Sequence, residues 1–265
     1  MPGLNNLKEF FHDNTAFRYF VLYSAPTWSN VSTLNYGYSP VSEEVLASAI
    51  GRNQAFQIEL YRQVFLALGR SLSPEQCLCE VSCGRGGGLA FIAGRTRARC
   101  IGLEKSWPAR RYARNRLGLD VRKSVAPAIA LDRASVDAFI SVEAFHSYAN
   151  DRFLEEAARC LRPGGIMAIA DRRRGSSEEN RRFEVSLFER NGFKITTFRD
   201  ITPNILEALR GDHDRKAGFL RWVSGTFIYD ELGEMFACVG SNKYQAFERG
   251  DWSYFLFSAV REPIL

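Results

Sequence analysis

The chain has 265 residues, 46% of them hydrophobic, which allows one large α/β domain with additions or two domains. No apolar run approaches the ~20 residues that a membrane-spanning helix needs, and no basic segment followed by an apolar run marks a secretory signal, so we expect a cytoplasmic protein. Six cysteines without paired C-x-x-C spacing argue against a metal site, and a net charge of +5 without a dense basic stripe argues against nucleic acid as a partner.

Residues 4–38 are rich in aromatic side chains, and helical spacing is plausible from Leu4 to Tyr23. This segment precedes the nucleotide-type core described below, so it must dock on that core from outside. It could be simple packed core, or it could cover the active site and line an apolar pocket, and the two interpretations are compatible. On the second interpretation we predict three substrate contacts: Tyr19, Trp28 and Tyr38. The segment could also join two copies of the chain.

A helix is expected to begin after Ser42, which suits the N-cap position and is followed by two acidic residues. It could run to Leu68, with a break near Gly51, and Gly69 suits its C-cap. We therefore expect residues 1–70 to form an N-terminal helical cap.

The stretch Cys77–Gly88 organises the rest of the chain. A short apolar run that contains Glu80 enters a glycine-rich turn, and the following residues, Leu89–Ala93, lack helix breakers. Strand, glycine loop and helix in this order let the backbone approach a ligand closely, because glycine has no Cβ and tolerates positive φ. The stretch predicts a nucleotide-type binding loop.

A second short strand is predicted over Arg99–Leu103, and it ends at Glu104. An acidic residue about 20 residues past the loop, at the end of the second strand, is where a nucleotide-type fold places a carboxylate on ribose hydroxyls. Glu104 could also be an ordinary exposed acid at a strand end.

Strands and helices alternate from there on. Further strands are predicted at 121–125, 137–142, 166–170, 193–198 and 252–260. Helices are predicted at 107–117, 151–161, 176–191 and from about 203 to 236, with a further segment to 247. This alternation implies a mainly parallel sheet covered on both faces, with ligands at the carboxyl ends of the strands. Those ends carry Ser82, Glu104, Val125, Glu143, His146, Asp171 and Arg172. We expect a core at 71–200, a helical lid at 201–250 and a last core strand within 251–265.

Several motifs together resemble a known family. From Glu80 to Gly86 the chain follows the pattern E-x-G-x-G-x-G at two-residue steps, with serine for the first glycine. Residues 141–148 and 158–165 resemble the central motifs of class I methyltransferases that use S-adenosylmethionine (SAM). Residues 35–38, 200–205 and 240–244 resemble the group of small-molecule methyltransferases of lipid and polyketide biosynthesis, the phthiotriolone methyltransferase type.

This resemblance implies a Rossmann-like α/β fold with a seven-stranded sheet in the order 3-2-1-4-5-7-6. The last strand would be antiparallel, and the lid would lie between strands six and seven. The implied cofactor is SAM, bound by Glu80, Ser82, Gly84, Gly86, Glu104, Val125, Glu143 and Ala144.

Two residues depart from the family's pattern. Ser82 replaces a glycine, which it can do if its backbone is not forced to positive φ. Val125 stands where the family usually has an aspartate that accepts from the adenine amino group. Losing that hydrogen bond would weaken binding by roughly 0.5–1.5 kcal/mol unless a loop atom or water replaces it.

The resemblance implies an enzyme that methylates an apolar natural product or lipid precursor at oxygen or carbon. His146 would be the general base for a hydroxyl acceptor, because histidine titrates near neutral pH. Tyr148 and Arg172 are further predicted substrate contacts, and an arginine here could bind an anionic substrate such as a prenyl diphosphate. Two alternatives stay open: a methyltransferase-fold cyclase of polyketide biosynthesis that binds SAM without transferring its methyl group, and a non-catalytic partner subunit.

Overall fold

The computed structural model describes residue 22, residues 30–221 and residues 227–262. Tyr19, Trp28 and most of the helix predicted over Leu4–Tyr23 lie outside these residues. The predicted substrate contacts at Tyr19 and Trp28, and the predicted contact between two copies through the N-terminal segment, therefore stay predictions.

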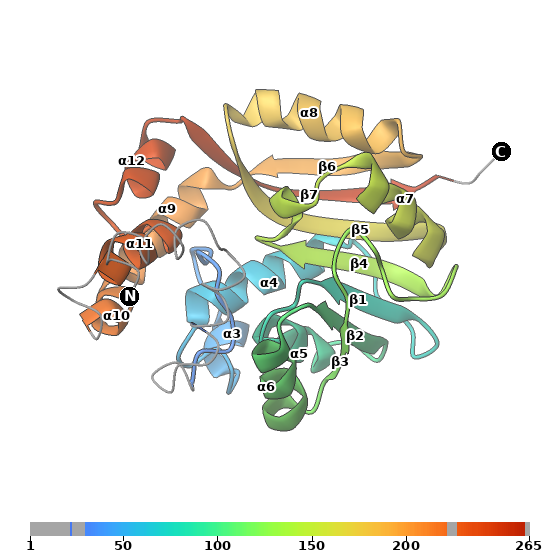
Figure 1. Ribbon diagram of the computed structural model, residues 1–265, viewed down its shortest axis with the longest axis horizontal. Coiled ribbons are helices and arrows are strands. Elements are labelled where there is room, and N and C mark those ends of the chain that lie inside the picture. The colour runs from blue at the N-terminus through green and yellow to red at the C-terminus, as the bar shows by residue number, and fades with distance from the viewer. Residues whose placement is uncertain (1–21, 23–29, 222–226, 263–265) are drawn as a thin grey trace, which may run out of the picture.

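Seven strands form one sheet in the order β3-β2-β1-β4-β5-β7-β6 (Figure 1). Their bounds are β1 Cys77–Val81, β2 Arg99–Glu104, β3 Asp120–Lys123, β4 Val136–Val142, β5 Leu161–Arg174, β6 Phe193–Asp200 and β7 Trp252–Arg261. The first five strands pair in parallel, and β7 runs antiparallel to both β5 and β6. The predicted strand order and the antiparallel last strand are confirmed.

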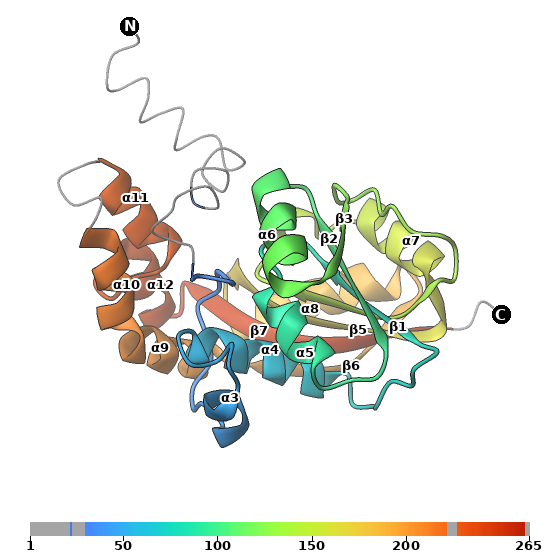
Figure 2. The same cartoon turned by 90° about the horizontal axis from the view of Figure 1, so that it is seen from below.

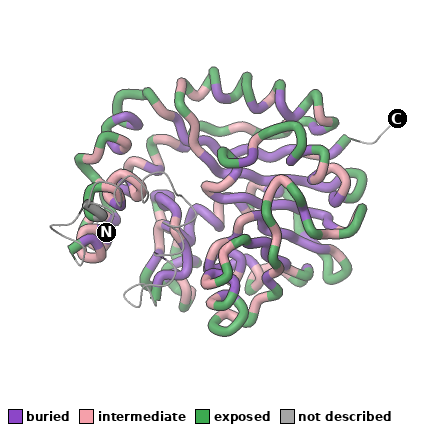
Figure 3. Tube along the Cα trace, viewed as in Figure 1, coloured by how far each residue is buried: buried purple, intermediate pink, exposed green. Residues whose placement is uncertain are grey.

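Helices cover both faces of this sheet. The helices are α3 Glu43–Ala47, α4 Ala55–Ala67, α5 Gly87–Ala93, α6 Trp107–Leu117, α7 Asp151–Cys160, α8 Ser177–Glu189, α9 Thr202–Gly211, α10 His213–Leu220, α11 Phe227–Met235 and α12 Asn242–Glu248, with a short 3-10 helix η2 at Phe145–Ser147. In the fully buried β4, Ala138 and Ile140 pack in one apolar cluster with α4 and α5, and Phe139 packs in the other with α7 and α8. Burial on both faces explains why such strands are apolar without alternation. Figure 3 shows the buried residues concentrated along the sheet.

Some predicted boundaries differ from the observed ones. Ser42 caps α3, and the break expected near Gly51 separates α3 from α4, since the chain turns through Gly51, where a Cβ would lie 2.1 Å from the Val45 carbonyl oxygen. The third strand ends at Lys123, because Val125 makes only an isolated bridge to Ala128.

The fifth strand is longer than predicted. Strand β5 begins at Leu161 and takes in the predicted turn, with Gly164 at φ +73° and a register shift between Val136 and Ala138 of β4.

The helices between β6 and β7 form a group at one end of the sheet, beside the segment that leads into α4 (Figures 1 and 2). A helical stretch to about residue 236 and a further segment to 247 were predicted here, and the described residues of this region form the separate helices α9, α10, α11 and α12. Gln57 of α4 donates to Asp212 at 2.8 Å, and Asn204 of α9 donates to the Ser39 carbonyl at 2.7 Å. None of the described helices combines the length and the apolar character that crossing a membrane requires.

Candidate functional site

A cavity of about 520 Å³ lies where the loops after β1, β2, β3 and β4 meet. This volume lies in the usual range for small-molecule sites. Eight of the predicted site residues line it: Ser82, Gly84, Glu104, Val125, Glu143, Ala144, His146 and Tyr148. Four others do not: Glu80, Gly86, Tyr38 and Arg172. Residues distant in sequence, Thr33, Leu34 and Tyr61, complete the wall.

The glycine loop bends sharply at the end of β1. Ser82, Gly84 and Gly86 have φ of 62°, 55° and 80°. The condition under which serine would fit without strain is therefore not met, because Ser82 holds the left-handed conformation itself. The next two glycines permit close approaches: a Cβ on Gly87 would lie 2.2 Å from the Ser32 hydroxyl oxygen, and one on Gly88 would lie 2.1 Å from the Tyr61 ring.

Glu80 lies directly behind this loop and is completely buried. Its Oε1 accepts from the Tyr61 hydroxyl at 2.8 Å, and its Oε2 has no hydrogen-bond partner among the described residues. Burial raises the pKa of Glu80 to about 8. A buried carboxyl oxygen without a donor is the kind of group that a ligand ammonium would satisfy.

Glu104 ends β2 and faces the cavity from the next strand. One oxygen accepts from the Gly84 N–H at 2.9 Å and the other from the Ser106 N–H at 2.7 Å, while burial raises the pKa of Glu104. The carboxyl group thus ties the β1 loop to the β2 loop.

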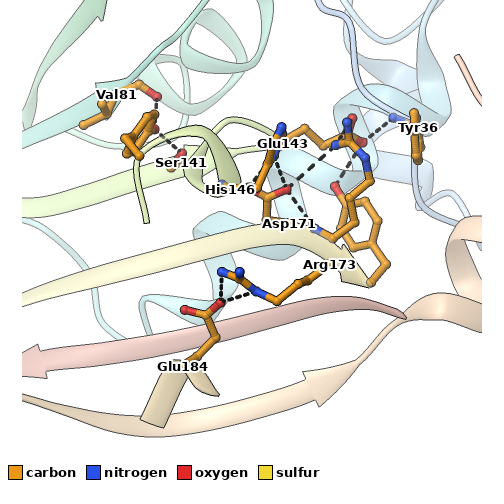
Figure 4. A network of polar contacts seen from close by, with 11 residues as sticks. Tyr36, Val81, Ser141, Glu143, His146, Asp171, Arg173 and Glu184 are labelled. Atoms are coloured by element: carbon orange, nitrogen blue, oxygen red, sulfur yellow. Dashed lines mark hydrogen bonds and ion pairs between the residues drawn. The ribbon is translucent and has the colours of Figure 1, made fainter. Parts of the chain in front are cut away.

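Glu143 follows β4 with a left-handed backbone, φ 53° (Figure 4). Its Oε1 accepts from the Tyr36 N–H at 2.6 Å and from the Tyr254 hydroxyl at 3.0 Å, and its Oε2 accepts from Arg172 at 3.3 Å. The guanidinium of Arg172 also lies over the Tyr36 ring, 4.8 Å from its centroid. Arg172, predicted as a substrate contact, is engaged inside the protein.

His146 and Asp171 form a pair on the β4 side of the cavity (Figure 4). The Nδ1 of His146 lies 2.9 Å from Asp171 Oδ1, and the His146 backbone N–H donates to Oδ2 at 2.7 Å. The His146 side chain is 37% exposed and that of Asp171 only 1%. Although burial alone would raise the pKa of Asp171, the hydrogen bonds to His146 and the charges of His146 and Arg172 hold it below its ordinary value.

The two predicted tyrosine contacts have different surroundings. Tyr148 lines the cavity, and its hydroxyl lies 2.8 Å from the Ser141 hydroxyl. Tyr38 is buried away from the cavity, and its backbone N–H donates to the Phe56 carbonyl at 2.9 Å.

Three residues at or beside the cavity had no role predicted from the sequence: Asp171, Trp107 and Ser106. The available signal for Asp171 was an aspartate within β5, the strand beside β4. Ser106 and Trp107, the N-cap and first residue of α6, gave no such signal. Among the described residues, no group of three or more His, Cys, Asp or Glu side chains is arranged to hold a metal ion.

Known proteins resemble the chain in sequence. Residues 79–169 match the family described as a methyltransferase domain. The phthiotriol/phenolphthiotriol dimycocerosates methyltransferase of Mycobacterium leprae is 28% identical over 210 residues, 77% of this chain and 76% of that protein. The fatty-acid O-methyltransferase of Mycolicibacterium smegmatis is 33% identical over 151 residues, 54% of each chain.

Solved structures share the fold. A geranyl diphosphate methyltransferase in complex with SAM has a TM-score of 0.64 at 18% identity and covers 87% of this chain and 99% of its own. The 4+2 cyclase SpnF has a TM-score of 0.71 at 16% identity and covers 93% and 94%. The matched methyltransferase domain, the strand order and the cavity at the strand ends agree: the chain belongs to the class I SAM-dependent methyltransferases, as a distant relative of the mycobacterial phthiotriol dimycocerosates methyltransferases.

Proposed function

We propose that the protein transfers the methyl group of SAM to an oxygen atom of an apolar, lipid-like acceptor, with His146 as the general base. The observation that carries the proposal is the hydrogen bond between His146 Nδ1 and the buried Asp171 at the cavity wall. A partly exposed histidine held by a carboxylate in a ligand-sized cavity is the usual arrangement for proton abstraction.

The residues around the cavity fit the cofactor. The Oε2 of Glu80, buried behind the cavity wall, lacks a donor, which would suit the methionine ammonium, and Glu104 at the wall would accept from the ribose hydroxyls. Gly84 keeps the loop backbone open to a ligand at the cavity wall, with Ser82 beside it, while the missing Cβ of Gly86 makes room for Leu119. Glu143 and Ala144 would border the methionine part, and Val125 the base. When bound, SAM supplies a methyl group activated by its sulfonium.

The chain's own part in the reaction is alignment and proton removal. Asp171 accepts from Nδ1–H of His146, which leaves Nε2 without a proton and available to the acceptor. Nε2 would take the proton of the acceptor hydroxyl, and the buried carboxylate would stabilise the resulting imidazolium.

An apolar acceptor is supported by the named relatives and by the cavity wall. The relatives' names specify phthiotriol dimycocerosates and fatty acids as what those enzymes methylate. Leu34 and Val142 contribute apolar surface to the wall, and Tyr148 contributes an aromatic ring. The shared fold of SpnF does not separate methyl transfer from cyclisation, so product analysis must do so.

The test incubates the purified protein with SAM and a panel of fatty acids and long-chain alcohols, and measures methylated product and S-adenosylhomocysteine together. We expect both in equal amounts. With the long-chain alcohols, His146→Ala should lower turnover at least ~100-fold with the affinity for S-adenosylhomocysteine unchanged, whereas fatty acids are already ionised at neutral pH and need no base. His213→Ala, outside the cavity, is the control. Unchanged turnover in His146→Ala would rule out His146 as the general base. A rearranged substrate without S-adenosylhomocysteine would favour the cyclase function.

A further inference from the structure

The cavity continues beyond Glu104 between the loops that follow β2 and β3. Strands β1, β2 and β3 are successive neighbours in the sheet, as Figure 1 shows, about 4.8 Å apart. In the proposed function, which this inference rests on, the methionine part lies at β1 and the ribose at β2. The base of the cofactor then reaches the loop after β3.

The walls of this base end are apolar and unusually exposed. The Trp107 side chain is 60% exposed and Val125 is 53% exposed. Pro108 and Ala126 line the same part of the cavity. An indole face beside an aliphatic side chain favours a flat aromatic ring, and such stacking is tolerant of the ring's substituents.

Few side-chain acceptors remain here to read the edge of a base. The Lys105 ammonium can only donate. The Ser124 hydroxyl already donates to the Ala128 carbonyl at 2.9 Å and accepts from the Ala130 N–H at 3.4 Å. Each oxygen of Glu104 accepts one backbone N–H, and in the proposed function its remaining acceptor capacity is taken by the ribose hydroxyls.

The Ser106 hydroxyl is the exception. Its oxygen is buried and has no hydrogen-bond partner among the described residues, and Ser106 lines the cavity next to Trp107. A hydroxyl rotates, so it can accept from an amino group or donate to a carbonyl. A carboxylate at this place would accept from an amino group and repel a carbonyl oxygen.

We propose that the base end holds a purine by stacking on Trp107 and does not discriminate between a 6-amino and a 6-oxo group. The protein then binds S-adenosylhomocysteine and its 6-oxo analogue, in which hypoxanthine replaces adenine, with similar affinity. Val125 is the residue that sets this tolerance, because it places an aliphatic side chain where a hydrogen-bond acceptor would select adenine.

The test is calorimetric titration of the full chain with S-adenosylhomocysteine and with the 6-oxo analogue. We expect dissociation constants within about threefold of each other for the wild type. Val125→Asp should favour the adenine compound at least tenfold, since a hydrogen bond to a charged group discriminates by about that factor. Val125→Asn is the matched control: its amide can turn to donate or accept, so the ratio should stay near that of the wild type.

Tryptophan fluorescence gives a second readout. Both ligands should quench the fluorescence of Trp107 to the same extent. Trp107→Ala should weaken the binding of both ligands at least fivefold without changing the ratio of their dissociation constants.

Each contrary outcome has a distinct meaning. A wild-type preference of tenfold or more for the adenine compound would overturn the proposed tolerance and leave the cofactor site intact. No preference in Val125→Asp would overturn the position assigned to the base. No binding of either compound would overturn the proposed cofactor site and, with it, this inference.

Discussion

Ser82 and Glu143 border the cavity in left-handed backbone conformations that residues with a Cβ rarely adopt. Each such residue costs about 1–2 kcal/mol relative to the right-handed form. At Glu143 the surroundings compensate, because its carboxylate accepts from Tyr36, Tyr254 and Arg172. Strain of this kind persists where neighbouring contacts hold it, and here it lies on both sides of the cofactor cavity.

The pKa of Glu80 makes stability depend on pH. Because burial raises it to about 8 from 4.5, the folded chain keeps a proton that the unfolded chain releases. This contribution to stability is complete below about pH 4.5 and is lost as pH rises towards 8. Glutamine does not ionise and can still accept from Tyr61. We expect the free energy of unfolding of Glu80→Gln, measured with urea, to exceed that of the wild type by about 2–4 kcal/mol at pH 8. Near pH 5 the difference between the two proteins should disappear. An equal difference at both pH values would contradict the raised pKa.

The buried pair of Glu143 and Arg172 should be strongly coupled. Glu143→Ala leaves the Arg172 guanidinium inside the protein with Asp171, at 3.8 Å, as its remaining carboxylate among the described residues, so we expect a loss of about 3 kcal/mol or more in the free energy of unfolding. Adding Arg172→Met should restore at least ~1 kcal/mol, because it removes the unpaired charge. Tyr254→Phe, which deletes one hydrogen bond to Glu143, should cost only about 1 kcal/mol. A double variant as unstable as the sum of the single ones would argue against coupling.

At the scale of elements, the start of α5 is fixed by contact with the segment before α3. The Gly87 N–H donates to the Ser32 carbonyl at 3.0 Å, and a Cβ on Gly87 would lie 2.9 Å from the Ser32 carbonyl carbon. Gly87→Ala should therefore lower stability by about 1–3 kcal/mol and weaken cofactor binding. Gly233→Ala in α11 meets nothing within 4 Å and should be neutral or raise stability by up to ~1 kcal/mol. Thermal unfolding of both variants distinguishes a steric effect from a general effect of alanine.

At the scale of the whole molecule, Asp212 joins the α9–α12 group to α4. It accepts from Gln57 and Arg215 and lies 3.9 Å from the buried Lys216. Asp212→Ala should cost about 3 kcal/mol, since it leaves that ammonium without its carboxylate. If this group of helices encloses the acceptor, the acceptor KM should rise while the Kd of S-adenosylhomocysteine stays the same.

The neighbouring exposed carboxylate offers a control. Asp214→Ala, two residues away on the surface of α10, should change neither the free energy of unfolding nor the KM of the acceptor. An equal effect of both substitutions would mean that general charge, and not the contact with α4, is responsible.

The strands were predictable to within a few residues because buried apolar runs and the turns between them are local properties of the sequence. The left-handed backbone of Ser82 was not predictable, because a serine in place of the family's glycine does not show which φ the backbone adopts there. The contact between His146 and Asp171 joins residues 25 positions apart, and it exists only because β4 and β5 are neighbours. Likewise, α9 and α10 meet at Asp212, whose partner Gln57 lies 155 residues away.

The insertion of β7 between β5 and β6 also determines the order of assembly during synthesis. Strand β6 has β7 as its single neighbour in the described sheet, and residues 201–251 separate the two. At ribosomal speeds of about 5–20 residues per second, roughly 3–10 s pass between the synthesis of β6 and that of β7, the strand that pairs with both β5 and β6. During this interval the unpaired edges of β5 and β6 can pair with other chains. We therefore expect the nascent protein to need chaperones most just before its last strand emerges.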